Sequence, residues 1–320
     1  MKKIFSGILI AIAVAACHND QKQAHQAARP AEQAMEPFPE PKVKISTVGI
    51  LLYDNYAVLD AMGPYHVFSE LMGAKVFFVG RHKGLVSTAG MKVQCDTSIN
   101  EVKQLDILVI PGGLNETYAL TKDTVLLNWV RTIDVHSKYT TSVCTGAWIL
   151  AATGLLKDKA ATTHWFGKQV LKEQFGISAR DKRYVQSGKY FTSAGVSAGI
   201  DMSLAVVKDV MGEKYTQMVM LDLEYDPQPP VKGGNEHNTD QAIVENMRDM
   251  YNSAVEPVLY PERTKAKPKI DNPKDPVCGM ALSTGYADTL HYHGKLYGFC
   301  SAHCKRAFKN APVSFVRHAR

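Results

Sequence analysis

The chain has 320 residues, of which 45% are hydrophobic, with 37 Lys and Arg, 31 Asp and Glu, and six cysteines. This composition excludes a wholly disordered chain and a multi-span membrane protein, and the cysteines are too dilute for a disulfide-stapled scaffold. Residues 265–320 hold ten Lys and Arg against three Asp, a net charge of +7. Since the whole chain has a net charge of +6, residues 1–264 have a net charge of −1. The length predicts about two domains, and the charge predicts a near-neutral body followed by a small basic piece.

The N-terminus has the pattern of an export signal. Lys2 and Lys3 precede an apolar run over residues 4–16 that is too short to span a bilayer comfortably. Small residues before Cys17 resemble the lipobox of bacterial lipoproteins, and an ordinary signal peptide is the alternative. Because Cys17 falls at the position that the lipobox requires, we expect its lipidation. His18 stands where the inner-membrane retention signal has Asp, so we expect an outer-membrane anchor facing the periplasm. Residues 1–17 are then the signal peptide and 18–42 a flexible tether.

The body, residues 43–226, alternates between strand and helix patterns. Strands are expected over residues 43–53, 74–79, 105–110 and 139–143, and a hairpin over 184–186 and 190–193. Helices are expected over residues 63–71, 123–137, 145–152, 197–211 and 213–224. The alternation predicts an α/β fold, a doubly wound, flavodoxin-like parallel sheet sandwiched by helices, with ligands at the carboxyl ends of the strands.

Cys144 lies where an expected strand turns directly into a helix. A helix N-terminus aimed at the thiol predicts a lowered pKa and a nucleophilic thiolate. The backbone amides of Thr145 and Gly146 lie beside it. Those of Gly112 and Gly113, at the end of the neighbouring strand, are expected to complete an oxyanion hole. The alternative interpretation is a buried structural cysteine.

Five segments together resemble the ThiJ/PfpI superfamily, which has the class I glutamine-amidotransferase-like fold. They are residues 59–64, 110–113, 144–146, 162–165 and 193–201. The pattern is most similar to isonitrile hydratases and to the amidotransferase-like halves of certain AraC-type regulators. The resemblance implies a nucleophilic Cys144, an acidic Asp60 and a hydroxyl at Thr145. Without it, Asp60 is equally well interpreted as a helix cap before Gly63.

The implied chemistry is hydration of an isonitrile. Cys144 attacks the isonitrile carbon to give a thioimidate, and Asp60 acts as general acid and then activates water. Thr145 orients Asp60 or the water, and hydrolysis releases an N-substituted formamide. No cofactor is expected for this domain.

Two departures narrow the activity. PfpI-type proteases place His directly after the nucleophile, where this chain has Thr145. A deglycase of the same superfamily has Glu where this chain has Asp60. A protease, glyoxalase or deglycase is therefore disfavoured. His164 is expected to line the substrate pocket or to be structural, and Cys95 is interpreted as a packed residue rather than a second nucleophile.

The basic tail contains Cys278, Cys300 and Cys304, and three thiolates suit Cu(I) or Zn²⁺. Residues 273–318 resemble a YHS domain, a small α+β module related to metal-sensing modules. His291, His293 and His303 are candidates for a fourth ligand, with none preferred. Packed thiols or a disulfide are the alternatives.

Residues 227–272 are expected to be a linker with one short helix over residues 239–252. The leading hypothesis is an envelope-anchored, isonitrile-hydratase-like lyase fused to a metal-binding module. A non-catalytic ligand- or metal-sensing lipoprotein, or a metal-handling protein with a redox-sensitive body, are the alternatives. The expected partners are a small-molecule substrate, a metal ion, the membrane through the lipid, and a second copy of the chain in a homodimer, without nucleic acid.

Overall fold

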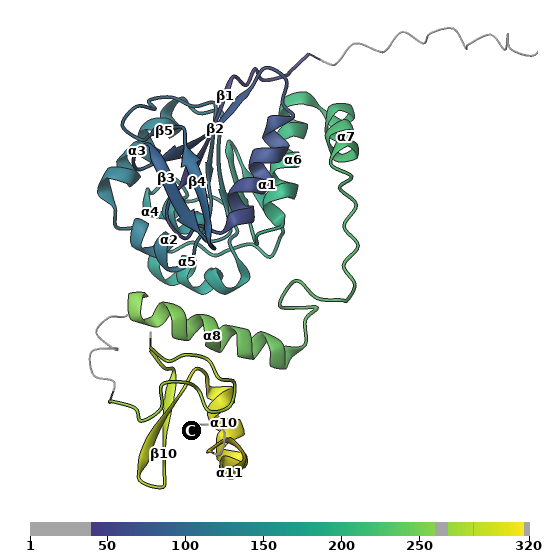
Figure 1. Cartoon of the computed structure of the whole chain (residues 1–320). Coiled ribbons are helices and arrows are strands. Elements are labelled where there is room, and N and C mark those ends of the chain that lie inside the picture. The colour runs from purple at the N-terminus through teal and green to yellow at the C-terminus, as the bar shows by residue number, and fades with distance from the viewer. Residues whose placement is uncertain (1–39, 260–267, 284, 317–320) are drawn as a thin grey trace, which may run out of the picture. The chain divides into compact units, whose positions relative to one another are not determined.

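The structure, a computed structural model, describes residues 40–259, 268–283 and 285–316 (Figure 1). The body is built on a seven-stranded sheet in the order β5-β2-β1-β6-β7-β9-β8. Its strands are β1 (Thr47–Leu52), β2 (Lys75–Gly80), β5 (Thr97–Ser98), β6 (Ile107–Ile110), β7 (Tyr139–Val143), β8 (Tyr184–Ser187) and β9 (Tyr190–Ser193). All neighbours pair in parallel except β8, which is antiparallel to β9.

Helices cover both faces of the sheet (Figure 1). On one side α1 and α6 bury apolar residues against the sheet and α7 packs on α6, and on the other side α2, α3, α4 and α5 cover the sheet. The bounds are α1 (Val58–Ser69), α2 (Asn115–Leu120), α3 (Thr124–His136), α4 (Gly146–Ala152), α5 (Lys168–Phe175), α6 (Ala198–Met211) and α7 (Glu213–Asp222), with a 3₁₀ turn at Trp165–Gly167. The predicted doubly wound fold is therefore confirmed.

The central strands β6 and β7 lie where the sequence predicts them, because burial on both faces gives them a recognisable sequence pattern. Every residue of β6 and β7 is buried, as a near-continuous apolar or β-branched run predicts for a parallel sheet. A separate hairpin of β3 (Gly84–Thr88) and β4 (Met91–Cys95) was not predicted beyond a strand-like run around Cys95. Cys95 is fully buried, which agrees with its interpretation as a packed residue.

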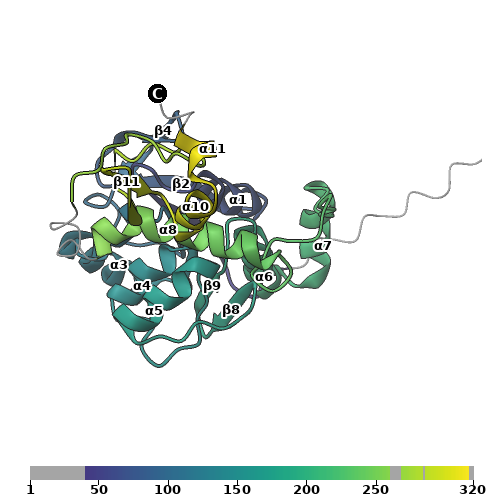
Figure 2. The ribbon, with the colours of Figure 1, turned by 90° about the horizontal axis from the view of Figure 1, so that it is seen from below.

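Two expected helix boundaries were wrong. Helix α1 begins at Val58 rather than Gly63, so Pro64 lies inside it and removes the hydrogen bond that would reach the Asp60 carbonyl. The linker helix, α8 (Gln241–Leu259), has 19 residues and continues through Pro257, beyond the end expected at residue 252. Figure 2, which views the ribbon from below, shows α8 crossing in front of the body.

The C-terminal region, described over residues 268–283 and 285–316, is a small α+β unit. Its elements are the antiparallel strands β10 (Asp288–Tyr292) and β11 (Lys295–Phe299) and the helices α10 (Ala302–Asn310) and α11 (Pro312–Val316). Phe299 and Phe308 are fully buried at the centre of its apolar cluster. This cluster is small for an independent domain, so a ligand-held staple would add stability.

The predicted signal peptide, the lipidation site Cys17 and the predicted tether up to residue 39 lie outside the described residues. At the end of the tether, the Lys42 N–H donates to the Val210 carbonyl at 2.8 Å. Among the helices of the described ranges, none combines the length and apolar character needed to cross a bilayer. The lipid anchor, its outer-membrane location and the homodimer stay predictions.

Candidate active site and thiol cluster

Cys144 sits on a sharp turn between β7 and α4, at the carboxyl edge of the sheet. Its φ of 56° is in the left-handed region, which is strained for a residue with a Cβ. Two hydrogen bonds hold this conformation: the Cys144 N–H donates to the Ser193 carbonyl at 3.2 Å, and the Thr163 hydroxyl donates to the Cys144 carbonyl at 2.8 Å. Strain maintained in this way at a strand–helix turn is typical of a presented nucleophile.

Asp60 faces this thiol from the first turn of α1 and is fully buried. Its Oδ2 accepts the Gly112 N–H at 2.9 Å, and its Oδ1 has no hydrogen-bond partner among the described residues. The helix-cap interpretation is wrong, because Ala57 occupies the cap of α1 and no side chain bonds there. Burial raises the pKa of Asp60 to about 7, although the bond from Gly112 and the contact with Cys144 act to lower it.

The predicted lowering of the Cys144 pKa is wrong. Burial raises the pKa of this thiol well above its ordinary value, and the charge of Asp60 raises it further. The Thr145 N–H and hydroxyl act in the opposite direction but do not prevail. The seven-residue helix α4 cannot compensate for removal of the thiolate from water, because desolvation of a charge outweighs one short helix terminus. The resting site therefore favours a protonated thiol beside a carboxyl group whose pKa is raised to about 7.

The predicted oxyanion hole is wrong at two positions. The Gly112 N–H donates to Asp60, and the Gly113 N–H donates to Thr145 Oγ1 at 3.2 Å, so both amides are already used. The Thr145 N–H acts on the Cys144 thiol, as expected for an amide beside the nucleophile. Gly146 opens α4, and a Cβ there would lie 2.1 Å from the Ile110 carbonyl oxygen, so close packing fixes this glycine.

Thr145 does not bond to Asp60 within the described structure. Its buried hydroxyl accepts the N–H groups of Gly113 and Leu114, each at 3.2 Å, and donates to Thr117 Oγ1 at 3.1 Å. Tyr53 continues the chain of bonds, with its hydroxyl 3.0 Å from Thr117 Oγ1. The predicted orienting role therefore shifts: Thr145 fixes the loop that carries Gly112, and Gly112 holds Asp60.

Sequence reasoning missed Tyr53, Thr117 and Tyr251 as neighbours of the site. The charges of Asp60 and Cys144 both act on the Tyr53 hydroxyl, whose pKa burial raises well above its ordinary value. His164, a predicted pocket residue, belongs to an aromatic cluster with Trp165 and Tyr251, and burial lowers its pKa to about 4. His164 is therefore neutral at pH 7, and its contact with substrate stays a prediction.

The three cysteines of the C-terminal region converge as predicted. Cys278 Sγ lies 3.4 Å from Cys300 Sγ, and Cys300 Sγ lies 3.6 Å from Cys304 Sγ. A carboxylate oxygen of Asp275 joins them, with all four candidate ligand atoms within 4.8 Å of one another. Each cysteine that the structure describes is a free thiol, and these distances exceed the roughly 2.05 Å of a disulfide.

Asp275, rather than a histidine, is the fourth member of this cluster. Its side chain is buried and accepts the N–H groups of Val277 at 2.8 Å and Cys300 at 2.7 Å. These bonds hold the turn at Cys278 against the end of β11. The candidate histidines, His291, His293 and His303, are exposed and are not part of the cluster. In the sequence, Asp275 before Pro276 indicates only a turn, so it was not predicted as a metal ligand.

Comparison with known proteins gives the same two parts. A DJ-1/PfpI family model matches residues 46–209, which is just over half of the chain. The chain belongs to the DJ-1/PfpI family. A YHS domain model matches residues 273–319, so the tail is a YHS domain.

Three relatives illustrate the range of this DJ-1/PfpI domain. An isonitrile hydratase from Pseudomonas putida is 35% identical over 202 residues, covering 63% of this chain and 88% of the relative. The HTH-type transcriptional regulator CdhR from Pseudomonas aeruginosa is 28% identical over 136 residues, and this chain spans 40% of its length. The crystal structure of a ThiJ/PfpI family protein from Pseudomonas syringae has a TM-score of 0.65 at 31% identity, covering 73% of this chain and 95% of that one.

Substitution of Gly112 tests how closely the residues around Cys144 and Asp60 are packed. A Cβ at Gly112 would lie 2.7 Å from Thr145 N and 2.9 Å from Asp60 Oδ2, closer than real contacts allow. We expect Gly112→Ala to lower the free energy of unfolding by about 1–3 kcal/mol and to displace Asp60. Gly195→Ala is the matched control, because its Cβ would meet only His164, at 3.8 Å. Urea denaturation of both variants measures this difference, and equal stabilities would disprove the close packing.

Proposed function

We propose that the DJ-1/PfpI domain hydrates small isonitriles to N-substituted formamides, with Cys144 as nucleophile and Asp60 as the acid–base group. One observation carries this proposal: a fully buried carboxylate with an unpartnered Oδ1 faces a thiol on a strained strand–helix turn. An unpaired buried oxygen is unfavourable for stability, and such positions are typical of functional sites.

The first step forms a bond between Cys144 Sγ and the terminal isonitrile carbon. The thiol proton passes to ionised Asp60 and from there to the same carbon, which gives the thioimidate R–N=CH–S. Because the thiol pKa is raised and that of Asp60 is about 7, the proton starts on sulfur and the carboxylate is the base. A neutral resting thiol also avoids an unpaired thiolate in this buried site.

The second step consumes water. Asp60 takes one proton from the water that adds to the C=N carbon and delivers it to the imine nitrogen, which gives the tetrahedral adduct R–NH–CH(OH)–S–Cys. The C–S bond then breaks as the hydroxyl of the adduct becomes the carbonyl, its proton passes through Asp60 to the Cys144 sulfur, and R–NH–CHO leaves. The sum is R–NC plus H₂O giving R–NH–CHO, so this cycle needs no redox partner or cofactor.

The test is incubation of purified protein with a simple alkyl isonitrile and detection of the formamide by mass spectrometry or NMR. We expect turnover in the wild type and its loss in Cys144→Ser, because a serine hydroxyl is a far weaker nucleophile than a thiol. Cys95→Ala is the matched control, since Cys95 is also buried but lies away from Asp60. No formamide from the wild type, or equal turnover in Cys144→Ser, would refute the enzyme and favour a ligand-binding protein.

The thiol cluster supports a second proposal, that the YHS domain binds one soft or borderline metal ion. A tetrahedral site with metal–sulfur bonds of about 2.3 Å separates its sulfur atoms by about 3.8 Å, close to the 3.4 and 3.6 Å found here. Cys278, Cys300 and Cys304 would be the sulfur ligands of Cu(I) or Zn²⁺, and Asp275 a fourth. The bound cation would staple two turns and a helix around a small core.

A further inference from the structure

Helix α8 lies outside the segment matched by the DJ-1/PfpI model, yet it is packed against the body. Val244 and Val255 on α8 are buried, with exposed fractions of 9% and 2%. Asn115, in the first turn of α2, donates a side-chain N–H to the Ala254 carbonyl at 3.1 Å. Because Asn115 follows β6, this bond places the middle of α8 at the edge of the sheet where Cys144 lies.

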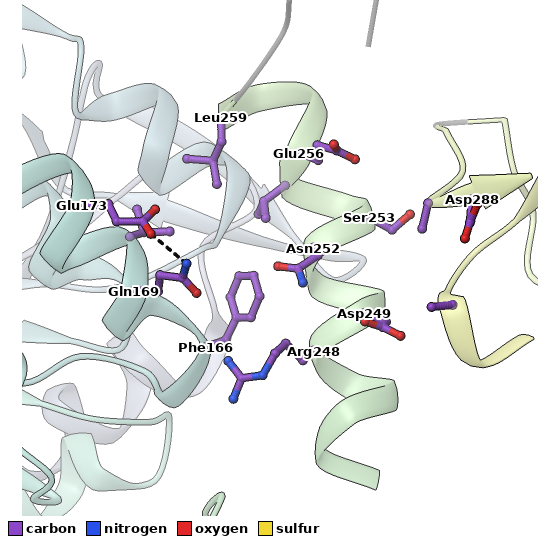
Figure 3. Close-up of a pocket in the computed structure, with 14 residues that line it drawn as sticks. Phe166, Gln169, Glu173, Arg248, Asp249, Asn252, Ser253, Glu256, Leu259 and Asp288 are labelled. Carbon is purple, nitrogen blue, oxygen red and sulfur yellow. Dashed lines mark hydrogen bonds between the residues drawn. The ribbon is translucent and has the colours of Figure 1, made fainter. Parts of the chain in front are cut away.

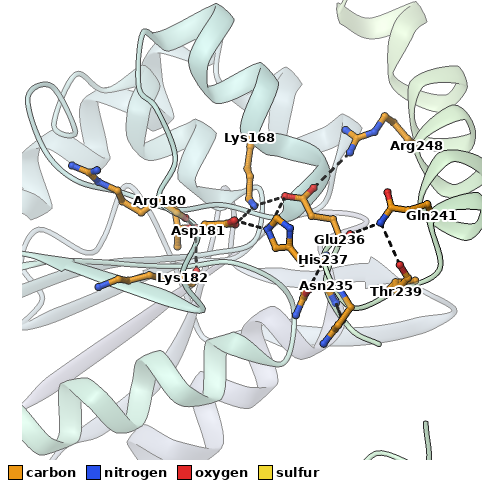
Figure 4. Close-up of polar contacts among 12 residues, drawn as sticks. Lys168, Arg180, Asp181, Lys182, Asn235, Glu236, His237, Thr239, Gln241 and Arg248 are labelled. Carbon is orange, nitrogen blue, oxygen red and sulfur yellow. Dashed lines mark hydrogen bonds and ion pairs between the residues drawn. The ribbon is translucent and has the colours of Figure 1, made fainter. Parts of the chain in front are cut away.

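Ion pairs fix the start of α8 (Figure 4). Glu236, which precedes the helix, pairs with Lys168 at 2.7 Å and with Arg248 at 3.5 Å, and only 20% of its side chain is exposed. The Arg248 guanidinium also lies over the Trp165 ring at 5.1 Å. Single exposed ion pairs contribute little, but this shared carboxylate joins α5, the linker and α8 in one network.

Tyr251 extends from α8 into the aromatic cluster beside the active site. Its ring centroid lies 4.9 Å from that of Phe166, 5.7 Å from that of His164 and 5.8 Å from that of Trp165. His164 follows Thr163, whose hydroxyl donates to the Cys144 carbonyl at 2.8 Å, so the ring that Tyr251 contacts stands next to a direct partner of the nucleophile. Burial raises the pKa of Tyr251, and Cys144 contributes in the same direction. Tyr251 therefore links α8 to the turn that carries Cys144.

A groove lies between α5 and α8 (Figure 3). Phe166, Arg248 and Asn252 are among its lining residues, whereas Cys144 and Asp60 are not. Phe166 thus lines the groove and also contacts Tyr251. Cys144 itself is only 8% exposed, so a substrate must displace or pass a side chain before it meets the sulfur.

We propose that Tyr251 closes the Cys144 site and sets the size of the isonitrile N-substituent. This inference rests on the proposed hydratase function. The cluster that Tyr251 forms with Phe166 and Trp165 is aromatic, and neutral His164 adds no charge, so we expect the accepted substituents to be small and apolar. Tyr251 is a specificity-determining residue that comes from a helix beyond the family-matched segment.

The first test compares methyl and cyclohexyl isonitrile in steady-state kinetics. We expect Tyr251→Ala to raise the ratio of kcat/KM for cyclohexyl over methyl by at least about tenfold, because truncation removes the ring that excludes bulk. Tyr251→Phe keeps the ring and should keep the ratio. Ile243→Ala, a truncation of a 53% exposed α8 residue, is the matched control and should also keep it. An unchanged ratio in Tyr251→Ala overturns the proposal.

A second test does not depend on turnover, so it separates failure of the gate from failure of the hydratase. Cys144 is labelled with iodoacetamide or with the bulkier N-cyclohexylmaleimide, and the rate is followed by mass spectrometry of its peptide. We expect Tyr251→Ala to accelerate the bulky reagent more than the small one. If this variant does not fold, Tyr251→Leu should give a smaller shift in the same direction. Equal acceleration of both reagents, or none, overturns the proposal.

Discussion

Replacement of Asp60 by asparagine should abolish hydration and stabilise the folded protein at the same time. Asparagine is nearly isosteric, and its oxygen can still accept the Gly112 N–H that Asp60 now accepts at 2.9 Å. It cannot take the proton of the Cys144 thiol, so the first chemical step loses its base. We expect a fall in kcat/KM of about 10²–10⁴, the usual contribution of a general acid–base group.

The gain in stability follows from the raised pKa of Asp60. Its pKa is about 7 in the folded protein against an ordinary 3.8, so the folded state binds more protons than the unfolded state between these values. Wild-type stability is therefore lost as pH rises from about 4 through 7, because the buried carboxyl group must ionise. Asparagine avoids this, and we expect Asp60→Asn to add on the order of 2–4 kcal/mol at pH 8 and little at pH 4.

Urea denaturation at pH 4, 6 and 8 measures this difference. Asp106→Asn is the matched control of opposite sign: burial acts to raise the pKa of Asp106, but bonds from Lys138 and from the N–H groups of Ser46 and Thr47 hold it below the ordinary value. That variant should lose stability at pH 8. A pH-independent effect of Asp60→Asn would contradict the assignment of a proton to Asp60.

In the wild type, kcat/KM should fall as pH decreases below about 7, because protonated Asp60 cannot act as a base.

The sheet could be predicted because its strands carry their own signal. β7 is the clearest case: Tyr139–Val143 matches the expected strand at both ends, and the turn into Cys144 follows directly. Edges and short elements were less accessible. In the β3–β4 hairpin, which is partly exposed, β4 alternates apolar and polar residues but β3 does not, and α2 has only six residues, too few to show a helical period.

The site residues were predictable as residue types, but not their protonation or their partners. A strand–helix turn suggests a helix dipole acting on Cys144, whereas the sign of the pKa shift depends on how completely the folded body excludes water. Gly112 appeared as an oxyanion donor until the structure placed the Asp60 carboxylate in front of its N–H. Tyr251 is 107 positions from Cys144, and no local pattern marks such an approach.

Removal of one cysteine from the YHS domain should abolish stoichiometric metal binding. We expect the purified wild type, loaded with Zn²⁺ or Cu(I) under reducing conditions, to retain about one ion per chain, and Cys300→Ser to retain none. Cys300 is central to the cluster, because its sulfur is the one that lies near both Cys278 and Cys304. Cys95→Ala is the matched control and should bind as the wild type does, since its thiol is buried in the DJ-1/PfpI domain.

Asp275→Asn tests the fourth ligand. The Val277 N–H bonds to Oδ1 and the Cys300 N–H to Oδ2, so asparagine keeps one of these two bonds and lacks the negative charge that a fourth ligand would supply. We expect weaker binding by about tenfold or more with stoichiometry retained, as for loss of one oxygen ligand or its orientation. Competition with a chromophoric chelator measures both quantities, and the metal should also raise the thermal midpoint of the YHS domain in the wild type. Metal retained by Cys300→Ser would refute the ligand set, and affinity unchanged in Asp275→Asn would remove Asp275 from it.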